Sequence, residues 1–170
     1  MTTPPQWQPN GLYVPAGQTM ILPSGLYLFP GLKVDGTLTG TGVNIIIGSG
    51  GFGDSHNGNN AGTGTINMTA GTGGGLSDMN GVLMFDLEGN GASTPPQVRF
   101  AGQFTSNFNG AIYFPYSHLT YRGGSNLTGC MIVVAQVLDF GGNSSMDMSG
   151  CSDSVLSSIV PQANVVMLTN

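Results

Sequence analysis

Two acidic residues are the best candidates for catalysis in this sequence. Asp86 and Glu88 stand two positions apart at the end of an apolar run, and residues at i and i+2 of a strand point to the same side. Glycoside hydrolases use two carboxylates about 5–10 Å apart, so the pair has suitable chemistry. Two surface-facing strand residues explain the same spacing without catalysis, and the basic side chain that a β-helix lyase would add is scarce. We therefore predict no catalytic residues.

The chain has two cysteines, Cys130 and Cys151, and each follows a glycine. No Cys-x-x-Cys spacing accompanies them, so a redox centre is not indicated. If adjacent coils of a stacked fold held the pair, their Cα atoms would lie about 4.8 Å apart, within the disulfide range of about 4.4–6.8 Å. We expect a structural disulfide in an oxidising compartment, with a buried reduced pair as the alternative.

Metal and nucleotide signals are weak. His56 and Asp54 share a Gly/Asn-rich segment but lack further ligands nearby, and His118 precedes an expected strand as a corner residue. The segment 50–54, Gly-Gly-Phe-Gly-Asp, lacks one spacer of the calcium nonapeptide and does not repeat. Residues 71–75 are Gly-rich, but no Lys-Ser/Thr follows as in a phosphate loop. We expect neither a metal site nor a cofactor.

Threonines at i and i+2 suggest a different kind of site. Thr37 and Thr39 form one such pair, and Thr63 and Thr65 form another. Members of each pair would share one face of a strand, and a flat threonine array can bind ice or polysaccharide. Threonine is also a common surface residue of strands, and the pattern does not recur in every expected coil.

Composition excludes several classes of function. Only 6% of the 170 residues are charged, with three basic and eight acidic residues and a net charge of −5. Three scattered cations cannot neutralise a phosphate backbone or an anionic membrane, so we expect no nucleic acid partner and no membrane insertion. No apolar run is long enough to span a bilayer. Residues 1–5 resemble no export signal, so we expect that a signal or anchor has been removed from an extracytoplasmic protein.

Short apolar runs bounded by Gly, Asn, Ser and Thr predict an all-β chain, and 29 glycines and 10 prolines argue against long helices. Three Gly-rich polar insertions, 48–64, 71–80 and 89–97, are expected to be loops. The predicted strands are Leu12–Val14, Thr19–Leu22, Leu26–Phe29, Leu32–Val34, Val43–Ile47, Thr65–Thr69, Val82–Leu87, Val98–Ala101, Ala111–Phe114, Leu119–Arg122, Met131–Gln136, Val137–Phe140 and Val165–Leu168.

An internal repeat predicts how these strands are arranged. Residues 112–130 and 132–151 each contain an apolar run, a piece that ends in Gly-Gly and a piece that ends in Gly-Cys. A unit of about 20 residues matches one coil of a parallel β-helix, in which stacked coils bury side chains that one coil cannot bury alone. We predict one domain over 1–170, a right-handed parallel β-helix. Its first 20 or so residues would form a cap or first coil, and 152–170 a C-terminal cap. An antiparallel sandwich or jelly roll is the alternative.

The chain also resembles the C-terminal region of Flp pilus-assembly proteins of the TadE/TadG-like group, from about residue 20 to residue 150. The resemblance implies a non-catalytic structural or adhesive module of a bacterial tight-adherence pilus, with pilus or cell-surface proteins as partners. It supplies no catalytic residues. The membrane anchor and the von Willebrand A-type domain of that group are missing. A polysaccharide-binding or polysaccharide-degrading protein and a threonine-face ice or glycan binder are the alternatives. The matching segments are 22–27, 40–45, 81–85, 109–115 and 142–145.

Overall fold

Parallel strand pairing organises the whole protein. In the computed structural model, twelve strands form one sheet, and all pairs of neighbouring strands in the described residues run parallel. The structure describes residues 6–7, 11–52, 64–71, 79–86, 97–100, 105–124, 126–149 and 151. The strands are β1 (Gln6–Trp7), β2 (Leu12–Val14), β3 (Thr19–Leu22), β4 (Gly25–Val34), β5 (Thr37–Phe52), β6 (Thr65–Ala70), β7 (Val82–Asp86), β8 (Gln97–Phe100), β9 (Thr105–Tyr121), β10 (Asn126–Thr128), β11 (Met131–Phe140) and β12 (Ser145–Asp147).

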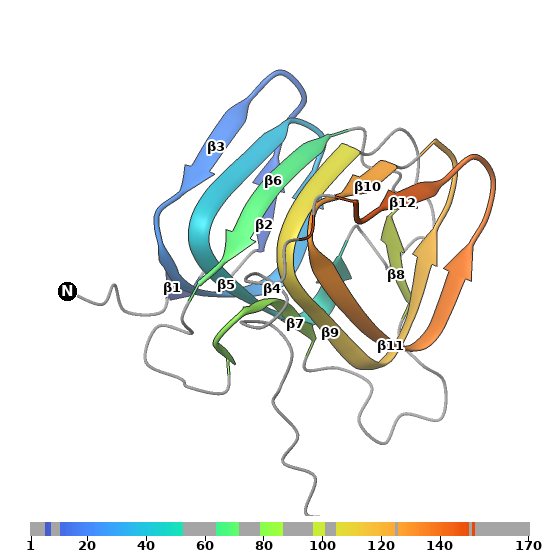
Figure 1. The fold of residues 1–170 in the computed structure, drawn as a ribbon. Coiled ribbons are helices and arrows are strands. Elements are labelled where there is room, and N and C mark those ends of the chain that lie inside the picture. Colours follow the sequence, from blue (N-terminus) through green and yellow to red (C-terminus); the bar gives the residue numbers. More distant parts are fainter. Residues whose placement is uncertain are drawn as a thin grey trace, which may run out of the picture.

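Long strands carry the chain round successive coils. β5 pairs with β3 and β6 along its first part and with β4 and β7 further on. β9 does the same with β6 and β10, then with β7, β8 and β11. Figure 1 shows the resulting coils side by side, with β3, β5, β6, β9, β10 and β12 following one another in chain order. This is the arrangement of a β-solenoid. The antiparallel alternative is wrong for the described strands.

The core consists of columns of side chains, one from each coil. Leu38, Ile66, Ser106 and Leu127 occupy one column and are buried, with Ser106 between Ile66 and Leu127. In another column Phe100, Tyr121 and Phe140 stack, with ring centroids 4.8 Å and 5.2 Å apart. Because parallel strands repeat at about 4.8 Å, in-register aromatic rings reach stacking distance without any further adjustment.

Several predicted breaks between strands are local register shifts inside one strand. Leu26–Phe29 and Leu32–Val34 are both parts of β4, and the register shifts between Phe29 and Gly31. Pro30 lies at that shift, where the missing N–H would interrupt a regular ladder. The predicted break between Gln136 and Val137 is likewise a shift within β11. The apolar runs were therefore found, but their continuity was missed.

The insertions begin later or end earlier than predicted. Residues 48–52 of the first insertion continue β5, and Gln97 of the third begins β8. The second insertion is held at its ends by Asn44, which is buried and donates from Nδ2 to the carbonyl oxygens of Met79 at 2.8 Å and Val82 at 2.6 Å. A buried amide needs such partners.

The repeat has a different register from the one that the Gly-Cys pairs suggested. Leu119 pairs with Leu138 as expected, but Ile112 pairs with Val133 instead of Ile132. Leu127 pairs with Met146, two positions before Met148. The segments between turns differ in length from coil to coil. A sequence alignment on the Gly-Gly and Gly-Cys pairs therefore shifts the preceding strands out of their observed register.

A disulfide joins Cys130 to Cys151, with Cα atoms 4.7 Å apart. Cys130 is buried next to the core, and its backbone N–H donates to Asn109 Oδ1 at 3.0 Å. The predicted C-terminal cap 152–170, including the strand Val165–Leu168, lies outside the described residues, as does most of the N-terminal ten. The described part of the chain contains no helix that could span a bilayer.

Replacing Cys130 and Cys151 together by Ser is expected to lower the free energy of unfolding by about 3 kcal/mol, because the cross-link restricts the unfolded chain. Urea denaturation of the oxidised protein and of the double variant measures the difference. Reduced wild-type protein should match the variant. An equal midpoint for all three samples would contradict the prediction.

Gly129→Ala should destabilise the protein much more than Gly17→Ala. Both glycines have positive φ, +111° and +75°, so either alanine costs about 1–2 kcal/mol in backbone strain. A Cβ at Gly129 would in addition collide with the Phe108 carbonyl oxygen of the preceding coil, whereas a Cβ at Gly17 meets nothing within 4 Å. Thermal denaturation of the two variants compares them, and equal losses would show that coil spacing does not matter at Gly129.

Candidate functional site

Polar side chains form ladders across one face of the solenoid. The outward residues that open successive rungs pair in register from β3 to β12 and are threonine in the first four rungs. This first column consists of Thr19, Thr37, Thr65, Thr105, Asn126 and Ser145. None of these residues is buried. Thr37 and Thr65, which belong to the two separate threonine pairs noted in the sequence, are thus neighbours in a continuous ladder.

A second and a third column lie beside the first. Residues two positions along each rung form the second column, and the third is shorter. Neighbours in a column are about 4.8 Å apart and neighbours on a rung about 6.6–6.8 Å apart. We call the three columns together the polar face. The second column is Ile21, Thr39, Asn67, Asn107, Thr128 and Asp147, and the third is Thr41, Thr69 and Asn109.

A groove of about 620 Å³ runs over the polar face. Apart from Ser24, which lies between β3 and β4, the polar side chains in its lining come from the second and third columns, on β5, β6 and β9. Apolar atoms at one end of the groove come from Ile21 and Leu22 of β3 and from the adjoining Pro23, and Met68 lies within it. Among the described residues of the lining, none is charged. The polar members are Ser24, Thr39, Thr41, Asn67, Thr69, Asn107 and Asn109.

The polar groups of the groove differ in how far the fold already uses them. Asn109 donates from Nδ2 to Asn107 Oδ1 at 3.2 Å, and its Oδ1 accepts the Cys130 N–H. Within the described residues, by contrast, the side chains of Thr39, Thr41, Asn67 and Thr69 make no hydrogen bond to the protein. Hydroxyl and amide groups can each donate and accept, so these four side chains are available to a ligand.

Charge reaches the polar face only at its last described rung. Asp147 closes the second column, and the Ser149 N–H donates to its Oδ1 at 2.9 Å. This hydrogen bond holds the pKa of the Asp147 carboxyl below its usual value, because it stabilises the ionised form. The described lining of the groove, which begins two rungs away at Asn107, carries no charged residue.

The apolar core is open at the last described coil. Leu138 continues the column of Val98 and Leu119 yet is 44% exposed, and Phe140 covers Tyr121 yet is 46% exposed. We call Leu138 and Phe140 the core end. Val137 beside them is 44% exposed as well. Apolar groups of this size in contact with water mark a surface that can bind another protein.

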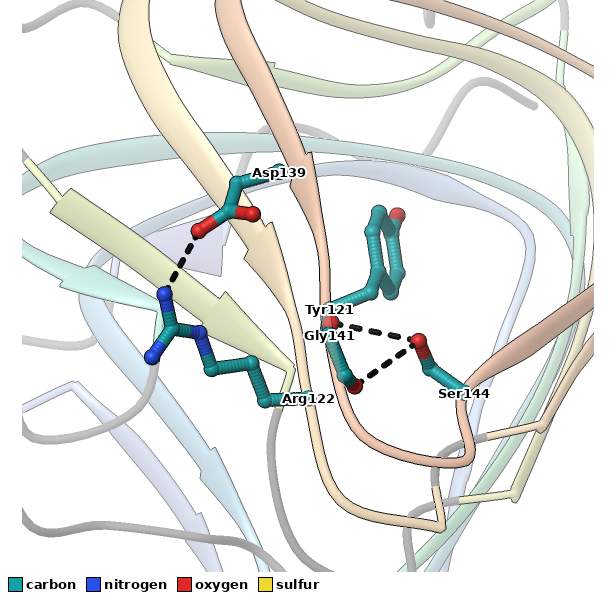
Figure 2. A network of polar contacts seen from close by, with 5 residues as sticks. All are labelled: Tyr121, Arg122, Asp139, Gly141 and Ser144. Carbon is teal, nitrogen blue, oxygen red and sulfur yellow. Dashed lines mark hydrogen bonds and ion pairs between the residues drawn. The ribbon is translucent and has the colours of Figure 1, made fainter.

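Polar contacts hold the corner next to the core end (Figure 2). Arg122 Nη2 donates to Asp139 Oδ2 at 2.8 Å, and this contact lowers the pKa of the Asp139 carboxyl. The Ser144 hydroxyl lies 3.2 Å from the Tyr121 carbonyl oxygen and 3.1 Å from that of Gly141. These contacts join the last two coils, so the core end is presented on a fixed backbone.

The acidic pair does not form a surface site. Asp86 is 3% exposed and accepts a hydrogen bond from Ser117 Oγ at 2.5 Å. Its register partner is the buried Ile47, so the expectation of a surface-facing residue is wrong for Asp86. Glu88 lies outside the described residues. The sequence alone does not predict this direction of the Asp86 side chain, because the direction depends on a register shift between Val82 and Met84.

The other candidates are not brought together. His118 lies inside β9, between Gln97 and Val137 in the ladder, and is not a corner residue before a strand. His56 and Asp54 fall outside the described residues, as do residues 53–54 of the segment 50–54 and residues 72–75 of the segment 71–75. The described part of the chain contains no cluster of three metal-ligating side chains.

Comparison with protein-family models, with curated proteins and with solved structures finds no match. The resemblance to TadE/TadG-like proteins therefore stays an expectation. What the polar face and the core end can do has to be argued from their own geometry.

Thr39→Val and Thr69→Val should each change the free energy of unfolding by less than about 0.5 kcal/mol, as is usual for surface positions. Ile66→Thr places a hydroxyl in the buried core column of β6 and should lower the free energy of unfolding by about 1–3 kcal/mol. Urea denaturation of the three variants tests this. A loss for Thr39→Val as large as that for Ile66→Thr would mean that its hydroxyl belongs to the fold.

Proposed function

We propose that the chain is a non-catalytic structural and adhesive module of a bacterial surface assembly of the Flp/Tad pilus type, built as a right-handed parallel β-helix. The observation that carries the proposal is the core end. A solenoid whose core columns end in exposed Leu138 and Phe140 has a ready surface for a protein partner, because burying that surface removes apolar area from water.

The edge of the sheet supports the same role. β11 pairs with β9, and β12 pairs with β10, but no further described strand pairs with either. Unpaired backbone groups on such an edge can accept a strand from another protein. A partner component that contributes a strand would satisfy these groups and cover the core end in one step.

Support for an extracytoplasmic location comes from the disulfide. Structural disulfides persist in oxidising compartments such as the periplasm and the cell surface. The Cys130–Cys151 bond lies in the coil next to the core end. A surface with few charged residues suits the same setting.

A non-catalytic role is supported by where the acidic groups lie. An enzyme that cleaves polysaccharides would need two carboxylates on one groove. The described lining of the groove contains none, and Asp86 lies in the interior with Ser117 as its partner. The polar face is therefore better suited to holding a ligand than to cutting it.

Leu138→Lys should abolish docking, because it would bury an unpaired charge at the interface. The full chain, tagged, is purified from the bacterium that produces it, and pilus-assembly proteins are quantified in the eluate. We expect at least a tenfold loss relative to wild type. Gln136→Lys, which adds the same charge at an exposed position of the same strand, is the matched control and should retain its partners.

Two results would contradict the proposal. One is the absence of pilus-assembly proteins from the wild-type eluate. The other is the release of reducing sugars when the purified protein is incubated with polysaccharides, because this would make the chain an enzyme.

A further inference from the structure

We infer that the groove on the polar face binds a neutral polysaccharide. The core end offers a protein interface, but it leaves the polar face unexplained. The groove lies on β3, β5, β6 and β9, whereas the core end lies on β11. The two surfaces are separate, so this inference does not depend on docking through the last coil.

The free polar groups of the groove match the hydroxyls of a sugar. Thr39, Thr41, Asn67 and Thr69 make no hydrogen bond within the described part of the protein. Each can donate to one sugar hydroxyl and accept from another. Because these side chains are carried by strands that pair on both sides, little conformational entropy is lost when they engage a ligand.

The apolar end of the groove complements the other surface of a sugar. Ile21 opens the second column, where its register partner is Thr39, and is 73% exposed. It lines the groove together with Leu22 and Pro23. A pyranose ring has hydroxyls at its edge and C–H groups on its faces. A groove with free hydroxyls on one part and apolar atoms on another can satisfy both.

The repeat of the ladders favours a polymer over a single sugar. Polar groups recur from rung to rung at about 4.8 Å, so successive units of one chain can contact the free groups of β5 and then those of β6. Contacts of one linked chain add with little further loss of freedom. We expect affinity to rise with the number of sugar units.

Charge selects neutral polysaccharides. No described residue of the groove is charged, and the chain as a whole carries a net charge of −5. An anionic polysaccharide would be repelled and would find no Lys or Arg in the groove. Binding that does not involve ion pairs should also be insensitive to salt.

Ice fits this surface less well. A surface that matches a crystal lattice has to repeat one residue type on a flat plane. The second column instead changes residue type along Ile21, Thr39, Asn67 and Asn107, and the surface there is a groove and not a plane. A flexible polymer tolerates both features.

The test measures binding of the full chain to insoluble cellulose, to chitin and to soluble β-1,3-glucan, with alginate as the anionic control. The double variant Thr39→Val/Thr69→Val removes two free hydroxyls and keeps the side-chain shape. We expect wild type to bind at least one neutral polysaccharide, at unchanged strength in high salt, and the variant to bind it about tenfold more weakly.

The matched control is Thr19→Val/Thr105→Val, which makes the same change in the first column, outside the groove. It should bind like wild type. Absence of binding to every neutral polysaccharide, preference for alginate, or equal losses in both double variants would overturn the inference. So would inhibition of ice growth that only the groove variant loses, since it would assign the face to ice. None of these outcomes affects co-purification with pilus proteins, so the two proposals fail separately.

Discussion

Hydrogen bonding between parallel strands of successive coils is the constraint on which the other features depend. Each coil satisfies the backbone of the next, and the register that this imposes repeats every side chain about 4.8 Å further on. The same pairing therefore builds the buried column of Leu38, Ile66, Ser106 and Leu127 inside and the threonine ladder outside. The buried columns and the outer ladders therefore follow the same strand register.

The regular strand register and the apolar core are interrupted at several described positions. The shift at Pro30 lets a residue without an N–H sit in a ladder, and Asn44 satisfies carbonyl groups at the ends of an insertion. Asp86 and Ser117 pair inside the core, where one alone would leave a costly buried polar group. The pairing is not complete, because the buried Ser106 Oγ, His118 Nε2 and Tyr121 Oη have no hydrogen-bond partner in the described part of the chain.

The sequence allowed the all-β class and most apolar strands to be predicted, because runs such as Val43–Ile47 and Met131–Gln136 carry β-branched residues between glycines. Rungs rich in Asn and Ser were missed. Neither Thr105–Asn109 nor Asn126–Thr128 was predicted as a strand, because the Asn and Ser residues in them have weak strand propensity. These segments are extended where they pair with Thr65–Thr69 or with one another.

The polar face was predicted only in fragments for the same reason. Thr37 and Thr39 were visible as a pair, but Thr19 becomes a neighbour of Thr37, and Thr105 of Thr65, only through coil register. Insertions of different lengths hide that register in the sequence. Asp86 was misjudged because the direction of one side chain depends on a local shift between Val82 and Met84.

The bond between Cys130 and Cys151 gives the solenoid a direction of unfolding. A stack in which each coil touches only its neighbours frays from its ends, one nearest-neighbour contact at a time. The disulfide, together with the Arg122–Asp139 contact, holds the last described coil, while β1, β2 and β3 are short strands that each pair with one other strand among the described residues. Under tension or heat the first coil would unfold first, and the coil next to the core end would unfold last.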